Sequence, residues 1–255
     1  MLPCPTEQEI DFILSEANRY VSRPIRRSDV SAAWSGIRPL AKDPATLGSP
    51  TATLSRNHVI EVSDAQLVTI AGGKWTTYRR MAQDTIDIAC SFLKESQQKL
   101  PCCTHSVKMI GADRIGEVCG KKFDTITITL REKYNMDKDV AEHLMRNYGT
   151  RALQIAEIHN NGFDKNSRSC NHPKRLLAKY PYLEAEVIFA VRQEYAVKAV
   201  DVIARRTRLA FIDVKATESI VPRVVDLMGT LLNWSKARKK EEIAECEAFL
   251  KTMRN

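Results

Sequence analysis

The hydrophobic and polar positions of the first 37 residues predict a helix followed by a strand. Thr6 and Glu9 have the T-x-x-E spacing of a capping box, and apolar residues then recur every three or four positions as far as Val21. This spacing predicts an amphipathic helix over residues 7–21. After a polar connector, residues 30–37 carry a β-type run that leads into a Gly-Ile-Arg-Pro turn, so we expect a strand there.

Two short apolar runs and one helical stripe follow in the next segment. The runs at 59–62 and 67–71 are separated by a turn-forming Ser-Asp pair, which predicts a β-hairpin. Apolar residues at helical spacing then occupy 77–93, directly after two glycines. A helix is therefore expected to begin where the second strand ends.

The rest of the chain has a weakly patterned stretch and then a helical one. Residues 183–205 are apolar almost all round a helical wheel, so we expect one long helix buried at the centre of a helical domain. Pro222 is expected to begin another helix, and Ser235 to cap the last one. Together these patterns predict an α+β fold, in which a partial β-sheet with helices is followed by an all-α domain.

Composition and charge only slightly reduce the range of possible binding partners. The 255 residues are 44% hydrophobic and 27% charged, with a formal net charge of +8, as in an ordinary globular protein. The positive charge suits phosphate metabolites, nucleotides, anionic lipid or nucleic acid. No apolar run is long enough for a membrane span. The acidic N-terminal segment has the character of neither a signal peptide nor a transit peptide.

The seven cysteines are an odd number and are scattered along the chain. No C-x-x-C occurs, and Cys102 and Cys103 are adjacent rather than spaced as metal ligands. Cys170 and His172 are at most half of a metal site. The pattern predicts free thiols in a reducing compartment and no metal.

The strongest chemical candidate is the Gly-Gly-Lys-Trp-Thr-Thr run at residues 72–77. Glycines let the backbone approach a ligand closely, and the helix start that follows offers unpaired N–H donors to an anionic group. Lys74 can hold a phosphate or an alkoxide, and Arg38 of the Gly-Ile-Arg-Pro turn can add a second fixed positive charge. The same run also describes a plain turn between a strand and a helix, so the motif alone leaves both readings open.

The order of several motifs favours the first reading. The runs WSGIRPL, SRNH and GGKWTTYR, followed by YPYLEAEV, RRTRLAF and PRVVDLMGTLLNW, resemble the FAD-dependent glycerol-3-phosphate dehydrogenases of the mitochondrial type. The resemblance covers nearly the whole chain and is weakest over 94–131. It implies that residues 1–100 are the C-terminal part of an FAD and substrate domain, 101–124 a boundary segment and 125–255 the family's helical C-terminal domain.

The resemblance also implies a reaction. The family oxidises the C2 hydroxyl of sn-glycerol 3-phosphate to dihydroxyacetone phosphate and passes the electrons through FAD to quinone. By resemblance Arg38, Arg56 and Lys74 contact the substrate, and Arg38 and Lys74 also act in catalysis. The flavin lies against residues 72–74 (Gly72, Gly73 and Lys74) together with Thr76 and Thr77. His58 has the side chain of a general base, although a lone histidine on a strand is more often structural.

The family further implies residence at the mitochondrial inner membrane, membrane association through the full-length enzyme, and a possible homodimer.

Two features of the sequence depart from the pattern of this family. No G-x-G-x-x-G run follows a strand, so the adenosine and pyrophosphate half of an FAD site is missing. No EF-hand loop occurs either, and Asp164-Lys-Asn166 is not one. We therefore expect an incomplete C-terminal portion that is inactive and colourless by itself.

A second hypothesis belongs to another class of protein. The chain can be a non-catalytic helical interaction module whose basic surface binds a partner. Nucleic acid is not the expected partner, because lysines and arginines are spread along the sequence rather than striped with aromatic residues.

Overall fold

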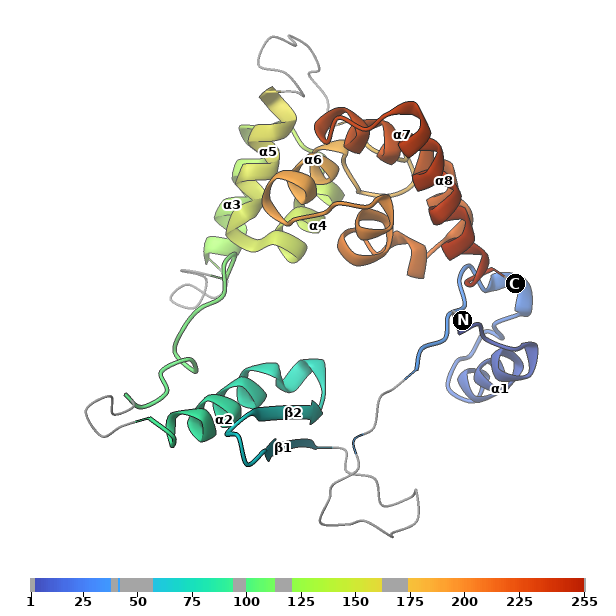
Figure 1. The fold of residues 1–255 in the computed structure, drawn as a ribbon. Helices are drawn as coiled ribbons and strands as arrows, with labels where there is room; N and C mark the ends of the chain where they lie inside the picture. The colour runs from blue at the N-terminus through green and yellow to red at the C-terminus, as the bar shows by residue number, and fades with distance from the viewer. Residues whose placement is uncertain are drawn as a thin grey trace. The chain divides into compact units, whose positions relative to one another are not determined.

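The computed structural model describes residues 3–37, 41, 57–93, 100–112, 121–161 and 174–254. They form two compact units (Figure 1). The hairpin unit is Ile37–Lys108, and the helical unit combines Met1–Gly36 with Met109–Asn255. The first 36 residues thus group with the helical part, whereas the sequence placed them with the hairpin. The domain boundaries expected at 100 and 125 stay a prediction.

The main elements follow one another along the chain in a simple order. They are α1 (Glu7–Asn18), β1 (His58–Val62), β2 (Val68–Gly72), α2 (Tyr78–Cys90), α3 (Lys121–Glu132), α4 (Lys138–Tyr148), α5 (Ala152–Asn161), α6 (Glu184–Gln193), α7 (Val214–Leu231) and α8 (Lys236–Lys251). The two strands and the helices around them, followed by helices alone, confirm the predicted α+β class with an all-α C-terminal part. Among the described helices none is both long and apolar enough to cross a membrane.

The hairpin unit consists of β1 and β2 with α2 packed beside them (Figure 1). The strands pair antiparallel, from His58 opposite Gly72 to Val62 opposite Val68. The hairpin and the helix after it are confirmed to within a few residues of the predicted bounds. Because β2 ends directly before the start of α2, the Gly-Gly-Lys run lies at the junction of strand and helix.

The first helix has the predicted cap. The Thr6 hydroxyl accepts a hydrogen bond from the Glu9 N–H, and the Glu9 carboxylate accepts one from the Thr6 N–H at 2.8 Å. The helix ends at Asn18, three residues before the predicted end. The Asn18 side chain accepts from the Ile25 N–H at 2.7 Å and donates to the Ile25 carbonyl at 3.0 Å. These bonds close a loop that turns the chain away from the helix.

The strand expected over 30–37 does not form; among residues 30–37 the structure shows extended chain without a strand partner. Its hydrogen bonds go to helix ends instead. The Ser31 carbonyl accepts from the Val214 N–H, and the Ala33 N–H donates to the Met253 carbonyl, each at 3.1 Å. Bonds to two separate helix ends cannot build a ladder, which is why the β-type run gave the wrong prediction.

The helical unit has two hydrophobic clusters, and α6 contributes to both. Val187 and Ala190 belong to the cluster with α7 and α8, while Ala185 and Phe189 belong to the one with α3, α4 and α5. All four side chains are buried. The central position predicted for this segment is therefore confirmed.

The single long helix predicted over 183–205 is wrong. Helix α6 ends at Gln193, and Tyr195 adopts a positive φ of 56° that a continuous α-helix does not contain. The chain resumes in a π-helical stretch, Asp201–Arg206. The Asp201 carboxylate accepts from the N–H groups of residues 197 and 198 at 3.1 and 2.9 Å. An aspartate in this position starts a new helical segment, and a hydrophobic pattern alone does not reveal the break.

Pro222 does not begin a helix but lies inside α7. The helix starts eight residues earlier, at Val214, and the Asp213 carboxylate caps it by accepting from the Ala216 N–H at 2.9 Å. Burial of the α7 face against α6 and α8 offsets the hydrogen bond that the proline removes. Ser235 caps α8 as predicted, since its hydroxyl accepts from the Arg238 N–H at 3.1 Å.

Candidate functional site

The junction of β2 and α2 is built on two glycines with left-handed backbone angles. Gly72 has φ +75° and Gly73 has φ +76°, values that residues with a Cβ rarely adopt. Lys74 then returns to an extended conformation and opens a 3₁₀ turn, Trp75–Thr77, which runs into α2. The glycines are required by the turn itself, so their presence alone does not demonstrate a ligand.

Gly73 also packs closely against its own unit. A Cβ added there would lie 2.6 Å from the Met81 sulfur and 3.2 Å from the His58 Cβ. We expect Gly73→Ala to destabilise the hairpin unit by about 1–2 kcal/mol, mainly through the strained φ, because the end of the Met81 side chain can shift. Urea unfolding followed by circular dichroism measures the effect.

The matched control for this prediction is Gly36→Ala, since a Cβ at Gly36 has no neighbour within 4 Å. That variant should leave the unfolding curve within about 0.5 kcal/mol of the parent. Equal curves for the two variants would show that the left-handed turn does not require glycine.

The start of the 3₁₀ turn that runs into α2 offers N–H donors to an acceptor. No side-chain hydrogen bond caps either the 3₁₀ turn or α2. The Thr77 hydroxyl donates to the Lys74 carbonyl at 3.0 Å, and the side chains of Lys74, Thr76 and Thr77 are exposed. An uncapped helix start carries partial positive charge on its N–H groups, and the Lys74 ammonium adds a full charge. This combination can bind an anion or a polar ring edge.

His58 lies directly beside this junction. It is paired with Gly72 in the ladder, and its Nε2 is 3.0 Å from Oδ2 of Asp84 on α2. Arg80 Nε donates to the same carboxylate, 2.9 Å from Oδ1. The His58–Asp84 contact ties β1 to α2, which is a structural role. A general-base role for His58 stays a prediction.

The structure therefore brings together most of the predicted site residues. Gly72, Gly73 and Lys74 form one continuous turn with the two threonines, and His58 lies across the ladder. Arg38 and Arg56 fall outside the described residues, so their place beside Lys74 stays a prediction. Asp84 was missed by sequence reasoning; its position four residues after Arg80 on the helix was the available signal.

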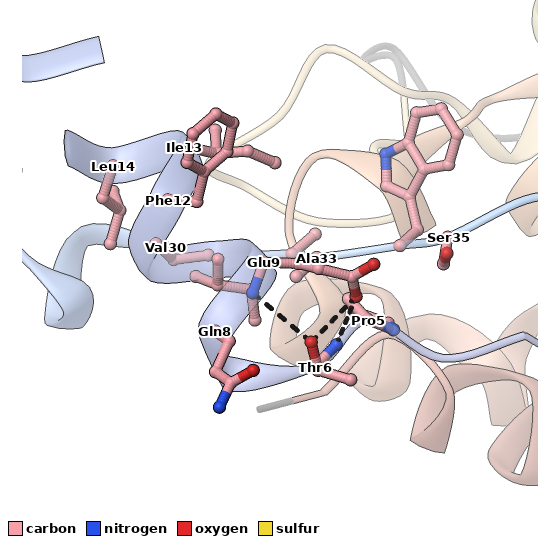
Figure 2. A pocket seen from close by; sticks show the side chains of 13 residues that line it. Pro5, Thr6, Gln8, Glu9, Phe12, Ile13, Leu14, Val30, Ala33 and Ser35 are labelled. Atoms are coloured by element: carbon pink, nitrogen blue, oxygen red, sulfur yellow. Dashed lines mark hydrogen bonds between the residues drawn. The ribbon is translucent and has the colours of Figure 1, made fainter. Parts of the chain in front are cut away.

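The helical unit contains a groove that holds none of the predicted residues. It lies between α1 and the extended segment 30–35, with a volume of about 960 Å³. Figure 2 shows Phe12 and Ile13 of α1, together with Val30, among the side chains that line it. Trp34 completes an apolar lining in which Phe12 and Ile13 are both more than 60% exposed. Glu9 is the one charged residue among the described residues that line the groove, and its carboxylate is used in the cap of α1.

Comparison with known proteins decides the family. Residues 102–239, more than half of the chain, match the family described as the C-terminal domain of alpha-glycerophosphate oxidase. The chain belongs to this family. The match spans the helices from α3 to α7 and does not include the Gly72–Thr77 junction.

Relatives of the alpha-glycerophosphate oxidase C-terminal domain family extend the similarity to the junction. The chain is 44% identical over 251 residues, 97% of its length, to the mitochondrial glycerol-3-phosphate dehydrogenase of Mus musculus. It is 40% identical over 258 residues to a probable mitochondrial glycerol-3-phosphate dehydrogenase of Dictyostelium discoideum. The chain spans 32% of the mouse protein and 38% of the Dictyostelium protein, about a third of each.

A solved structure shows the same fold. The glycerol-3-phosphate dehydrogenase of Bacillus halodurans, determined in complex with FAD, superimposes with a TM-score of 0.75 at 24% identity. The match covers 98% of this chain and 46% of the bacterial one. At this identity the comparison supports the fold of the family member described here, and nothing about its ligands.

Proposed function

We propose that this chain is part of an FAD-dependent glycerol-3-phosphate dehydrogenase. The reaction is oxidation of the C2 hydroxyl of sn-glycerol 3-phosphate to dihydroxyacetone phosphate, with electrons passed on to quinone. The observation that carries the proposal is the 44% identity over 97% of the chain to the mouse mitochondrial enzyme. The compared 97% of the chain spans the Gly72–Thr77 junction, where Lys74 is exposed at the start of a 3₁₀ turn that no side chain caps, and a cation in this position suits an anionic substrate.

Each side chain at the junction has a role in this proposal. The Lys74 ammonium binds the phosphate or the C2 oxygen, together with Arg38 and Arg56. Gly72, Gly73 and the two threonines offer their backbone and hydroxyl groups to the flavin edge. FAD, when bound, supplies the hydride acceptor. The N–H groups at the start of the 3₁₀ turn Trp75–Thr77, which no side chain caps, fit such a group because they stabilise negative charge on a ring edge.

The place of the reaction follows from the same relatives. The mouse and Dictyostelium proteins are both named as mitochondrial, and we extend that location to this chain. Association with the inner membrane, a homodimer and the quinone acceptor are further parts of the proposal.

A chimera tests the proposed function. This chain replaces the matching third of the mouse enzyme, and the purified protein is assayed for bound flavin by absorbance and for glycerol 3-phosphate-dependent reduction of a quinone analogue. We expect stoichiometric flavin and turnover within about tenfold of the mouse parent. The isolated chain, assayed in parallel, should be colourless and inactive.

The two readouts separate folding from chemistry. A chimera that binds flavin but shows no turnover with glycerol 3-phosphate would overturn the proposed substrate. Tight flavin binding by the isolated chain would overturn the expectation that this segment supplies only part of the FAD site.

A further inference from the structure

Two adjacent cysteines lie on an ordered turn after α2 in the hairpin unit. Cys102 is half-buried and Cys103 is exposed. The Cys103 carbonyl accepts from the Ser106 N–H at 2.9 Å and from the Ser106 hydroxyl at 2.8 Å. These two bonds close the turn over residues 103–106, directly after Cys102.

Thr104 connects the first thiol to an arginine of α2. The Thr104 Oγ1 is 3.0 Å from the Cys102 sulfur. Arg79 Nη1 donates to the same hydroxyl oxygen at 3.1 Å and to the Gln83 side chain at 2.9 Å. Because the guanidinium occupies a lone pair of the hydroxyl, the hydroxyl hydrogen is available to point at the sulfur. A sulfur that accepts a polarised O–H is stabilised as a thiolate.

Two hydrogen bonds favour ionisation of one thiol of the pair. The Thr104 hydroxyl and the Thr104 N–H lower the pKa of Cys102. Arg79 adds a smaller lowering effect, whereas desolvation and the charge of Asp87 oppose the shift in this pKa. The pKa of Cys246 is shifted in the opposite direction, because burial and neighbouring glutamates raise it to about 12. The hairpin unit therefore holds a thiol suited to nucleophilic attack, and the helical unit holds an inert one.

We propose that Cys102 and Cys103 form a dithiol redox pair that exchanges with low-molecular-weight disulfides. The Cys102 thiolate attacks one sulfur of the disulfide, the reagent's S–S bond breaks, and one thiolate leaves. Cys103, after losing its proton, attacks the Cys102 sulfur and releases the second thiol. The dithiol gives up two electrons and two protons, and the reagent disulfide becomes two thiols.

Adjacency makes the product easy to reduce again. Neighbouring Cα atoms are about 3.8 Å apart, whereas disulfides usually join Cα atoms about 4.4–6.8 Å apart. A bond between Cys102 and Cys103 is therefore strained, and strained disulfides have more oxidising potentials. The pair is a reversible couple and not a structural cross-link. This inference does not depend on the proposed dehydrogenase function.

The test uses the whole chain and oxidised glutathione. After reaction, acid quench and trypsin digestion, both thiols lie in one peptide, residues 100–108, which mass spectrometry resolves. In the parent this peptide should lose two hydrogen atoms and regain them with dithiothreitol. In Cys103→Ser it should instead carry one glutathione on Cys102. A parent peptide that keeps both thiols, or Cys103→Ser without an adduct, would overturn the redox pair.

Matched variants test the part played by Thr104. The pH at which adduct formation on Cys102 is half-maximal should rise by about one unit in Cys103→Ser/Thr104→Val. It should return toward the value for Cys103→Ser in Cys103→Ser/Thr104→Ser, which restores a hydroxyl. The comparison variant Cys102→Ser reports the reaction of Cys103. Equal pH profiles for the two cysteines would show that Thr104 and Arg79 do not activate Cys102.

Discussion

Glu186→Ala should lower the free energy of unfolding of the helical unit by about 3–5 kcal/mol. The Glu186 side chain is 1% exposed and satisfies three groups. It accepts from the Tyr148 hydroxyl at 2.8 Å and from the Leu183 N–H at 2.6 Å, and His143 Nε2 lies 2.8 Å from it. Alanine would leave these donors buried without an acceptor and would open a cavity between α4 and α6.

The surrounding groups fix which nitrogen of His143 carries the proton. Arg208 donates to the Asn147 side-chain oxygen at 3.1 Å, so the Asn147 amide nitrogen faces the histidine. That nitrogen is 3.0 Å from His143 Nδ1, which must then accept. In the neutral ring the hydrogen is on Nε2 and is donated to Glu186. The Glu186 carboxylate is therefore the last acceptor in a chain of hydrogen bonds that runs from Arg208 through Asn147 and His143. Removal of the carboxylate affects every residue of this chain.

Two further variants make the expectation on Glu186 falsifiable. Glu186→Gln keeps the volume and one oxygen but turns an N–H donor toward the Leu183 N–H, so it should cost about 1–3 kcal/mol. Glu247→Ala removes an exposed glutamate of α8 and should change stability by less than about 0.5 kcal/mol. Urea unfolding followed at 222 nm measures all three. Similar losses for Glu186→Ala and Glu247→Ala would exclude the buried network as a source of stability.

Lys74→Ala in the chimera with the mouse enzyme should lower kcat/KM for glycerol 3-phosphate by about 100-fold or more. Lys74 is exposed at the start of the 3₁₀ turn that precedes α2, where its ammonium can meet a phosphate or a developing alkoxide. The substitution removes a full positive charge beside the proposed position of the substrate phosphate or the developing alkoxide. Steady-state kinetics with a quinone analogue gives kcat and KM separately.

The control for this variant is Lys215→Ala, which removes an exposed lysine near the start of α7. It should leave kcat/KM within about twofold of the parent chimera. Flavin absorbance should be the same in both variants, so that a loss of activity is not a loss of folding. Normal kinetics for Lys74→Ala with full flavin would remove Lys74 from the substrate site.

Local signals in the sequence were sufficient to predict much of the fold. The T-x-x-E cap at Thr6, the hairpin, and the helix after the two glycines all depend on side chains close in sequence. The apolar residues on all sides of α6 likewise predicted that this helix is buried centrally. The Gly-Gly-Lys junction was found for the same reason, because the residues that form it are consecutive.

The errors occurred where distant partners decide the outcome. Residues 30–37 look like a strand, but their hydrogen bonds go to Val214 and Met253, which no local pattern reveals. The helix expected through 205 is interrupted, and at the break the Ala199 N–H donates to the Glu242 carboxylate of α8, 43 residues away. Pro222 is tolerated inside α7 through burial against other helices. At the site, Asp84 contacts His58 across 26 residues, a pairing that no local pattern reveals.

The extended segment near the start of the chain has a consequence for how the helical unit opens. Its Ser31 carbonyl and Ala33 N–H hold the beginning of α7 and the residue two positions after α8. Fraying of the C-terminal helix therefore requires the N-terminal segment to detach as well. Amide hydrogen exchange at Val214 and at Ala33 should report the same opening event, although the two residues are 181 positions apart. Two ends of the sequence thus behave as one cooperative element.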